Sequence, residues 1–312
     1  MCRRPCRIAR RTAAAIFVFF VTVFARASVA DGDAVVALTP ADAAILASVV
    51  GNPDAGRLSR TAQALGSAKL LVAIYHGSRA QRYAAIEAAP YSDSPGELLP
   101  SLAALLAASE RGTAARAAAS LRAILEDPSS HARHFQERTV GEMSQIIDQL
   151  VPVTRDGRLD PDIRIAAIIG IERLTVLAAA KRRDWSLPLF DDSDVSIRRA
   201  AVEAQTLPLA DDMLRLVAKT VDADASAEVR GVAAALLCEN AVSHNVKEPS
   251  PDLTVMLQGV LRSGAIPSDV EAEILVCLTR FESSDRRREI VDAAVADARP
   301  EIAELIQSLH LR

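Results

Sequence analysis

A short pattern recurs along this chain at nearly constant intervals, and it restricts the fold more than any other feature. Each copy places an arginine near its start and small or apolar residues after it, as at 163–167 and 197–201. The arginines of the five copies are Arg82, Arg116, Arg164, Arg198 and Arg230. They are 34, 48, 34 and 32 residues apart, which is the length of a unit that buries its apolar face only by stacking on its neighbours.

The residues before the clearest copies predict where helices begin. Asp160 stands before Pro161, and this pair combines a good N-cap with a residue suited to the first helical position. Asp194 stands four residues before Arg198, so we expect it to cap its helix and to pair with that arginine along the first turn. We therefore interpret these acids as helix starts and not as a catalytic cluster.

The composition favours helices over sheets. Half of the residues are hydrophobic, but only 4% are aromatic. Strands of a sandwich or barrel are enriched in aromatic residues and threonine, whereas the alanine runs of this chain favour helix. Further amphipathic segments lie between the arginine copies, at 98–106, 143–150, 213–217 and 253–261. The sequence therefore predicts an all-α fold with two helices in each unit.

An aspartate-rich turn, a helix carrying the arginine pattern and a second amphipathic helix together resemble a HEAT repeat, including the bilin-lyase-like subset of that family. The resemblance covers residues 79–297 and is clearest around the last three arginines. It implies an α-solenoid of stacked antiparallel helix pairs, an armadillo-type superhelix. It also implies that Arg164, Arg198 and Arg230 join a ladder with acidic turn residues of adjacent units.

The segments on either side of these repeats depart from the pattern. Residues 31–78 are interpreted as an N-terminal helical cap or a degenerate repeat, and residues 298–312 as a C-terminal closing helix. In the last helix pair Glu271 stands where the pattern would place an arginine. We therefore expect the regular arrangement to fail towards both ends.

The N-terminus has the three parts of a signal peptide, which we assign to residues 1–30. Five arginines lie within the first 11 residues, an uncharged apolar run covers 13–24, and A-x-A-like cleavage patterns end at Ala27 and Ala30. The apolar run is shorter than the roughly 20 residues that span a bilayer. We therefore favour cleavage on the general secretory route over a retained anchor, and expect a periplasmic or secreted protein with no stable membrane insertion after cleavage.

Cleavage would make the chain markedly acidic. It would remove six of the 36 basic residues and none of the 40 acidic ones, so the formal net charge would fall from −4 to −10. Binding to nucleic acid without sequence preference needs a basic stripe, and adhesion to anionic lipid also needs positive charge. Both classes of partner are therefore disfavoured.

Two cysteines, Cys238 and Cys277, would remain after cleavage, and each lies in an apolar helical stretch. An oxidising compartment would permit a disulfide between them. Isolated cysteines on helices are more often buried as small hydrophobic residues, and we favour that interpretation.

No group of residues predicts a catalytic, cofactor or metal site. His131 and His134 have a spacing that can present two imidazoles to a metal, but without a third ligand we expect exposed loop residues. The run at 222–228 begins like a calcium loop but lacks the turn glycine and the closing glutamate. The basic runs at 181–183 and 286–288 are expected at a helix C-terminus and on a solvated helix face.

These features predict an exported, non-enzymatic interaction or scaffold protein that binds a protein or peptide through its stacked helices. The main alternative is an accessory or regulatory subunit, or a lyase-like enzyme, on the same scaffold. That alternative would need a polar cleft with perturbed acids on one face. A third possibility, a membrane-anchored structural protein, would require that the N-terminal segment is not cleaved.

Overall fold

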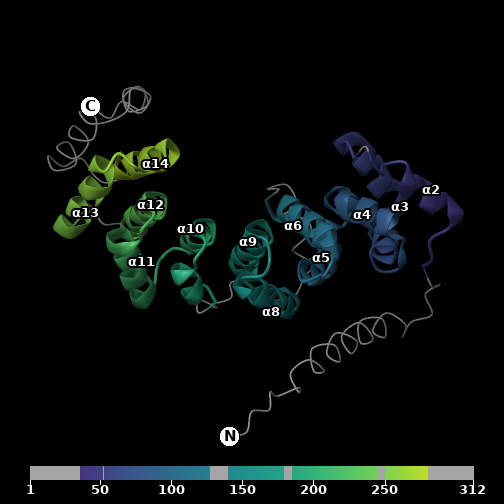
Figure 1. Ribbon diagram of the computed structural model, residues 1–312, viewed down its shortest axis with the longest axis horizontal. Helices are drawn as coiled ribbons and strands as arrows, with labels where there is room; N and C mark the ends of the chain where they lie inside the picture. The colour runs from purple at the N-terminus through teal and green to yellow at the C-terminus, as the bar shows by residue number, and fades with distance from the viewer. Residues whose placement is uncertain (1–35, 52, 127–139, 179–184, 245–249, 280–312) are drawn as a thin grey trace, which may run out of the picture.

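The computed structural model describes residues 36–51, 53–126, 140–178, 185–244 and 250–279 (Figure 1). These residues form twelve α-helices and three short 3₁₀ helices, and no β-strand lies among them. The prediction of an all-α fold is therefore confirmed. Several predictions fall outside the described residues: the signal peptide with Ala27 and Ala30, a closing helix at 298–312, exposed positions for His131 and His134, and the settings of both basic runs.

The chain runs from α2 at one end of the molecule to α14 at the other (Figure 1). The α-helices are α2 (Pro40–Ala47), α3 (Ala55–His76), α4 (Arg79–Ala88), α5 (Leu99–Leu106), α6 (Arg111–Glu126), α8 (Val140–Arg155), α9 (Pro161–Ala178), α10 (Val195–Glu203), α11 (Asp211–Ala223), α12 (Ala227–Ser243), α13 (Pro251–Arg262) and α14 (Ser268–Thr279). The 3₁₀ helices are η1 (Ala89–Tyr91), η2 (Pro95–Leu98) and η3 (Leu187–Asp191).

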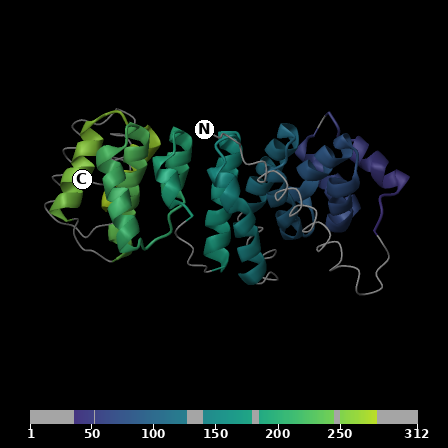
Figure 2. The same ribbon diagram turned by 60° about the horizontal axis from the view of Figure 1, so that its bottom comes forward.

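The helices follow one another along the molecule, as Figure 2 shows, and their contacts define two rows. In the first, which we call the arginine row, α4, α6, α9, α10, α12 and α14 each pack against the next. The second row holds α3, α5, α8, η3, α11 and α13; each of its members from α3 to α11 packs against the arginine-row helix that follows it in sequence. All five repeated arginines lie on the arginine row, so the repeat in the sequence marks a repeat in the packing.

Two acidic residues lie directly before arginine-row helices and bond to their first turns. Asp194 caps α10 by accepting a hydrogen bond from the N–H of Ser196 at 2.8 Å. Asp160 precedes α9, and its carboxylate accepts a hydrogen bond from the N–H of Asp162 at 3.2 Å. The first turn of a helix leaves backbone donors without a partner, and a cap of this kind stabilises by about 0.5–2 kcal/mol.

Small residues let the two rows approach closely. The alanine pairs at 166–167, 200–201 and 233–234 are buried in the core. Gly170 of α9 shows how tight the packing is, because a Cβ atom there would lie 2.8 Å from Cδ1 of Leu150 on α8. The larger apolar side chains between the helices each stabilise the fold by about 1.5–3 kcal/mol through burial.

The two cysteines form a disulfide, so the prediction that they are unpaired is wrong. Cys238 of α12 and Cys277 of α14 are both fully buried, and their Cα atoms are 6.2 Å apart. Because α14 packs against α12, two positions 39 residues apart in sequence meet. The apolar pattern within each helix indicates burial but not which residue lies opposite, and this is why the pairing is missed.

Candidate functional site

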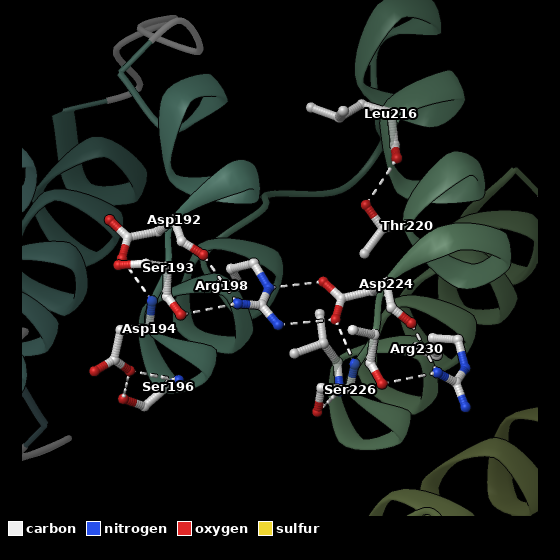
Figure 3. A network of polar contacts seen from close by, with 12 residues as sticks. Asp192, Ser193, Asp194, Ser196, Arg198, Leu216, Thr220, Asp224, Ser226 and Arg230 are labelled. Atoms are coloured by element: carbon white, nitrogen blue, oxygen red, sulfur yellow. Dashed lines mark hydrogen bonds and ion pairs between the residues drawn. The ribbon is translucent and has the colours of Figure 1, made fainter.

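The arginines of α9, α10 and α12 meet aspartates in the turns that precede α10 and α12. We define the ladder as Arg164, Asp192, Arg198, Asp224 and Arg230. The pairs follow one another along the arginine row, and Figure 3 shows the part from Asp192 to Arg230. The candidate site is therefore a chain of contacts between neighbouring helices.

Arg164 begins the ladder. Its side chain is 5% exposed, and its Nε donates a hydrogen bond to the carbonyl oxygen of Thr154 at 2.9 Å. Its Nη1 donates to Oδ1 of Asp192 at 3.3 Å, and its Nη2 pairs with the other carboxylate oxygen. Two parallel hydrogen bonds between guanidinium and carboxylate are stronger and more directional than one charge contact. They tie α9 to the turn before α10.

Arg198 repeats the arrangement one helix further along (Figure 3). Its Nε and Nη2 donate to the two carboxylate oxygens of Asp224 at 2.8 and 3.0 Å. Its Nη1 donates to the main-chain carbonyl of Asp192 at 2.9 Å, and Arg230 donates in the same way to the carbonyl of Asp224 at 2.7 Å. Each aspartate thus binds the preceding arginine with its carboxylate and the following arginine with its main chain.

The turns themselves hold the ladder aspartates in place. Oδ1 of Asp192 accepts a hydrogen bond from the N–H of Asp194 at 2.9 Å, and Oδ1 of Asp224 accepts one from the N–H of Ser226 at 2.7 Å. Burial raises the pKa of Asp192, but the hydrogen bonds from Arg164 and Asp194 outweigh it and leave the pKa below its ordinary value. The same balance lowers the pKa of Asp224. Both carboxylates are therefore ionised and engaged at neutral pH.

Asp194 does not pair with Arg198, so that part of the sequence interpretation is wrong. Its carboxylate is bonded to the N–H and hydroxyl of Ser196, whereas the guanidinium of Arg198 reaches the next turn. Asp160 accepts a hydrogen bond from Nη2 of Arg111, which is exposed, at 2.5 Å. The acids directly before the helices are caps, and the ladder uses other acids of the same turns.

The two ladder carboxylates, Asp192 and Asp224, do not stand out in the sequence from neighbouring turn acids. A signal that finds them is their position, because each lies two residues before the N-cap of its helix. In that position the carboxylate accepts the N–H of the cap residue and still faces the preceding helix. The ladder is therefore predicted better by an aspartate two residues before the N-cap and an arginine four residues after it than by the N-cap alone.

At the earlier contact between α4 and α6, the repeated arginine has different partners. Nε of Arg116 donates to Glu87 at 2.7 Å, and its Cζ lies 4.0 Å from the ring centre of Tyr83. The hydroxyl of Tyr83 donates to Glu110 at 2.6 Å. The side chain of Arg116 is 38% exposed, against 5% for Arg164. This junction is held by a cation–π contact and a partly exposed ion pair, outside the ladder.

An open hollow lies beside the ladder, where α9, α10 and α12 meet. Among its lining residues are Ile165, Val195, Arg199, Ala200, Glu203 and Glu228. Arg199 donates from Nε to Glu203 at 2.7 Å and also pairs with Glu228. The hydrogen bond to Glu203 raises the pKa of Arg199. Burial lowers this pKa, but the second hydrogen bond, to Glu228, raises it further. The hollow thus combines small apolar side chains with a charged group that is already paired.

The described part of the chain contains neither a metal-binding cluster nor a membrane-spanning helix. Within it, no group of three or more His, Cys, Asp or Glu side chains is arranged to hold a metal ion. Asp224, which lies in the run resembling a calcium loop, instead accepts hydrogen bonds from Arg198 and Ser226. Nor does any helix in this part have both the length and the apolar character that crossing a membrane requires.

Comparison of the chain with protein-family models, with curated proteins and with solved structures finds no match in any of the three. The fold and the site define the class as an all-α protein whose central helices are joined by arginine–aspartate pairs. The likeness to HEAT repeats stays a prediction from the sequence.

Proposed function

We propose that this chain is an exported, non-enzymatic interaction protein, built as an α-solenoid of HEAT-like helix pairs that present a surface to a protein or peptide. The observation that carries the proposal is the ladder, because the same pair of contacts joins α9 to α10 and α10 to α12. A contact that recurs from unit to unit is what a stack of equivalent units requires. The two rows of helices support the same architecture.

The chemistry of the ladder supports a structural role. A general acid or base works best when its pKa lies near the working pH. Burial raises the pKa of Asp192 and Asp224, but the hydrogen bonds from the arginines and the turn outweigh it, so both pKa values are lowered. The arginines donate hydrogen bonds to these carboxylates and to main-chain carbonyls. The ladder therefore holds helices in register, and a partner would bind beside it.

The hollow next to the ladder is the surface that we propose for docking. Ile165, Val195 and Ala200 offer apolar area, and the paired Arg199 lies among them. Protein interfaces combine an apolar centre with polar groups, and arginine is enriched in them. Because the ladder fixes the helices that line the hollow, a partner would meet a surface that is already ordered.

Export is supported by the disulfide between Cys238 and Cys277, because such bonds persist in oxidising compartments. The signal-peptide pattern at 1–30 leads to the same proposal. N-terminal sequencing of the protein recovered from outside the cytoplasm tests it directly. We expect a chain that starts at Ser28 or Asp31, and a chain that still starts at Met1 would contradict cleavage.

Site-specific crosslinking tests the interaction itself. A photo-reactive residue would be placed at Val195 in the hollow or, as a matched control, at Val255 of α13 in the second row; these valines are 40% and 68% exposed. We expect one defined protein to be captured at Val195 and not at Val255, and the purified pair to bind with a measurable Kd. Equal capture at both positions, no capture at Val195, or turnover of a substrate by the purified chain would contradict the proposal.

A further inference from the structure

Among the residues that the structure describes, the ladder ends at α12. Arg230 donates to the carbonyl oxygens of Asp224 and Ala225, which lie in the turn before its own helix. On α14 the corresponding position of the repeat is Glu271, which is buried. The repeat therefore supplies no arginine on α14 to continue the ladder beyond α12.

Acidic side chains gather at the same junction. Burial, together with the charges of Asp269, Glu203 and Glu239, raises the pKa of Glu273 on α14. The acids come from α14, α10 and α12, so like charges meet across the packed helices. Arg199 opposes them, since its Nη2 lies 4.0 Å from Oδ2 of Asp269, but the same guanidinium is bonded to Glu203 at 2.7 Å. Burial and the neighbouring acids make the ionised form of Glu273 less favourable in the folded chain, and Arg199 partly offsets them.

Apolar packing at this junction is close, and buried apolar side chains lie along the length of α14. α14 packs chiefly against α12. Near the start of α14, Gly231 of α12 lies so close that a Cβ atom there would be 2.9 Å from Cγ2 of Ile266 and 3.0 Å from Cγ1 of Val270. Near the end of α14, the disulfide between Cys277 and Cys238 joins this helix to α12. The close contact at Gly231 thus lies near one end of α14 and the disulfide near the other.

We propose that the junction of α12 and α14 is a redox-dependent clasp, in which the Cys238–Cys277 disulfide holds α14 in place where the ladder has ended. Reduction opens this end of the arginine row, while the ladder keeps α9, α10 and α12 together. The clasp rests on the geometry of the junction and does not depend on the proposed binding function.

The chemistry of opening is ordinary thiol–disulfide exchange. A dithiol attacks one cysteine sulfur, the S–S bond breaks, and both cysteines leave as thiols while the dithiol is oxidised to its own internal disulfide. Cys238 and Cys277 are fully buried, so attack requires a local opening of the junction first. Once reduced, the junction has no disulfide to hold α14 onto α12.

Hydrogen exchange of the full chain, with and without dithiothreitol, tests the clasp. After reduction we expect the amides of α14 to exchange about tenfold faster or more, and those of α9 and α10 to change less than about twofold. The variant Cys238→Ala/Cys277→Ala should reproduce this pattern without reductant. Unchanged protection of α14 after verified reduction would overturn the proposal, as would equal loss of protection in α9 and α10.

A second comparison isolates the charges. In the Cys238→Ala/Cys277→Ala background, Glu273→Gln should slow exchange of α14 about threefold, because it removes an acid whose charged form is disfavoured there. The matched control is Glu97→Gln, which changes an exposed glutamate of η2 at the other end of the molecule and should leave α14 unaltered. No slowing with Glu273→Gln, or the same slowing with Glu97→Gln, would contradict the inference that the charge of Glu273 opposes the packing of α14.

Discussion

α12 is joined to its two neighbours in the arginine row by different means. On one side, Arg198 of α10 binds the carboxylate of Asp224 just before α12. On the other side, Cys238 is bonded to Cys277 of α14, the helix that also carries Glu273. A buried ion pair gives directional contacts but must offset desolvation, whereas a disulfide acts largely by restricting the unfolded chain. The same packing of helices can therefore be secured by polar pairing or by a covalent bond. Acid acts on the ion pair and a reductant acts on the disulfide, so the two treatments distinguish the two kinds of contact.

Removing Arg164 should have the largest effect on the ladder side of this comparison. The side chain of Asp192 is 16% exposed, and Arg164→Ala leaves its carboxylate without the bidentate partner. Breaking a buried pair in this way destabilises by about 3–5 kcal/mol. Urea unfolding followed by circular dichroism measures the change in the free energy of unfolding.

A matched control separates burial from charge. Arg158 pairs with Asp156 at 2.7 Å, but its side chain is 89% exposed. Exposed pairs contribute little to stability, so Arg158→Ala should leave the unfolding midpoint almost unchanged. If both variants lost the same stability, the ladder would be no different from a surface ion pair.

Close packing at the other side of α12 gives the next largest effect. Gly231→Ala places a Cβ atom 2.9 Å from Cγ2 of Ile266, a β-branched and stiff side chain, so overpacking should destabilise by about 1–3 kcal/mol. Gly259 of α13 has no neighbouring atom within 4 Å of such a Cβ, and Gly259→Ala should stabilise by about 1 kcal/mol through helix propensity. Thermal unfolding of both variants checks the opposite signs, and stabilisation by Gly231→Ala would contradict the close contact.

Acid should act on the two sides of α12 in opposite directions. The pKa values of Asp192 and Asp224 are lowered in the folded chain, so their stabilisation is present above the ordinary aspartate pKa of about 3.9 and is lost as the pH falls below it. The pKa of Glu273 is raised, so protonation relieves repulsion as the pH falls from neutral towards the ordinary glutamate value of about 4.3. Hydrogen exchange of α10 and α14, corrected for intrinsic rates, measures both trends; the same trend in both helices would contradict the assignment.

The smallest effect is expected at the junction of α4 and α6, outside both regions. Tyr83→Leu removes the ring that lies 4.0 Å from the guanidinium carbon of Arg116 but keeps an apolar side chain. A partly exposed cation–π contact contributes about 0.5–1 kcal/mol, and the hydrogen bond from the Tyr83 hydroxyl to Glu110, which is lost as well, about 0.5–1.5 kcal/mol. The loss should therefore stay below that of Arg164→Ala. Urea unfolding of the two variants compares them, and an equal loss would place this junction on a par with the ladder.

Features that follow from a regular spacing of residues along the chain could be predicted from the sequence. Features that depend on contacts between positions far apart in the sequence could not. The all-α fold follows from the apolar periodicity. The spacing marks five arginines, and the three that the resemblance to HEAT repeats assigns to a ladder, Arg164, Arg198 and Arg230, lie in the one observed. The partner of Arg198 lies 26 residues away, and Asp194 was the nearer acid with a plausible helical spacing. The disulfide joins positions 39 residues apart and depends on the packing of α14 onto α12.

A double-mutant cycle on Arg198 and Asp224 tests most directly whether the ladder secures neighbouring helices. The free energy of unfolding would be measured for the unmodified chain, Arg198→Ala, Asp224→Ala and the double variant. Residues in one buried network couple by about 0.5–3 kcal/mol, and the bidentate geometry of this pair predicts a value in the upper half of that range. Additive losses, with a coupling free energy near zero, would show that the pair does not hold α10 and α12 together and would contradict the account.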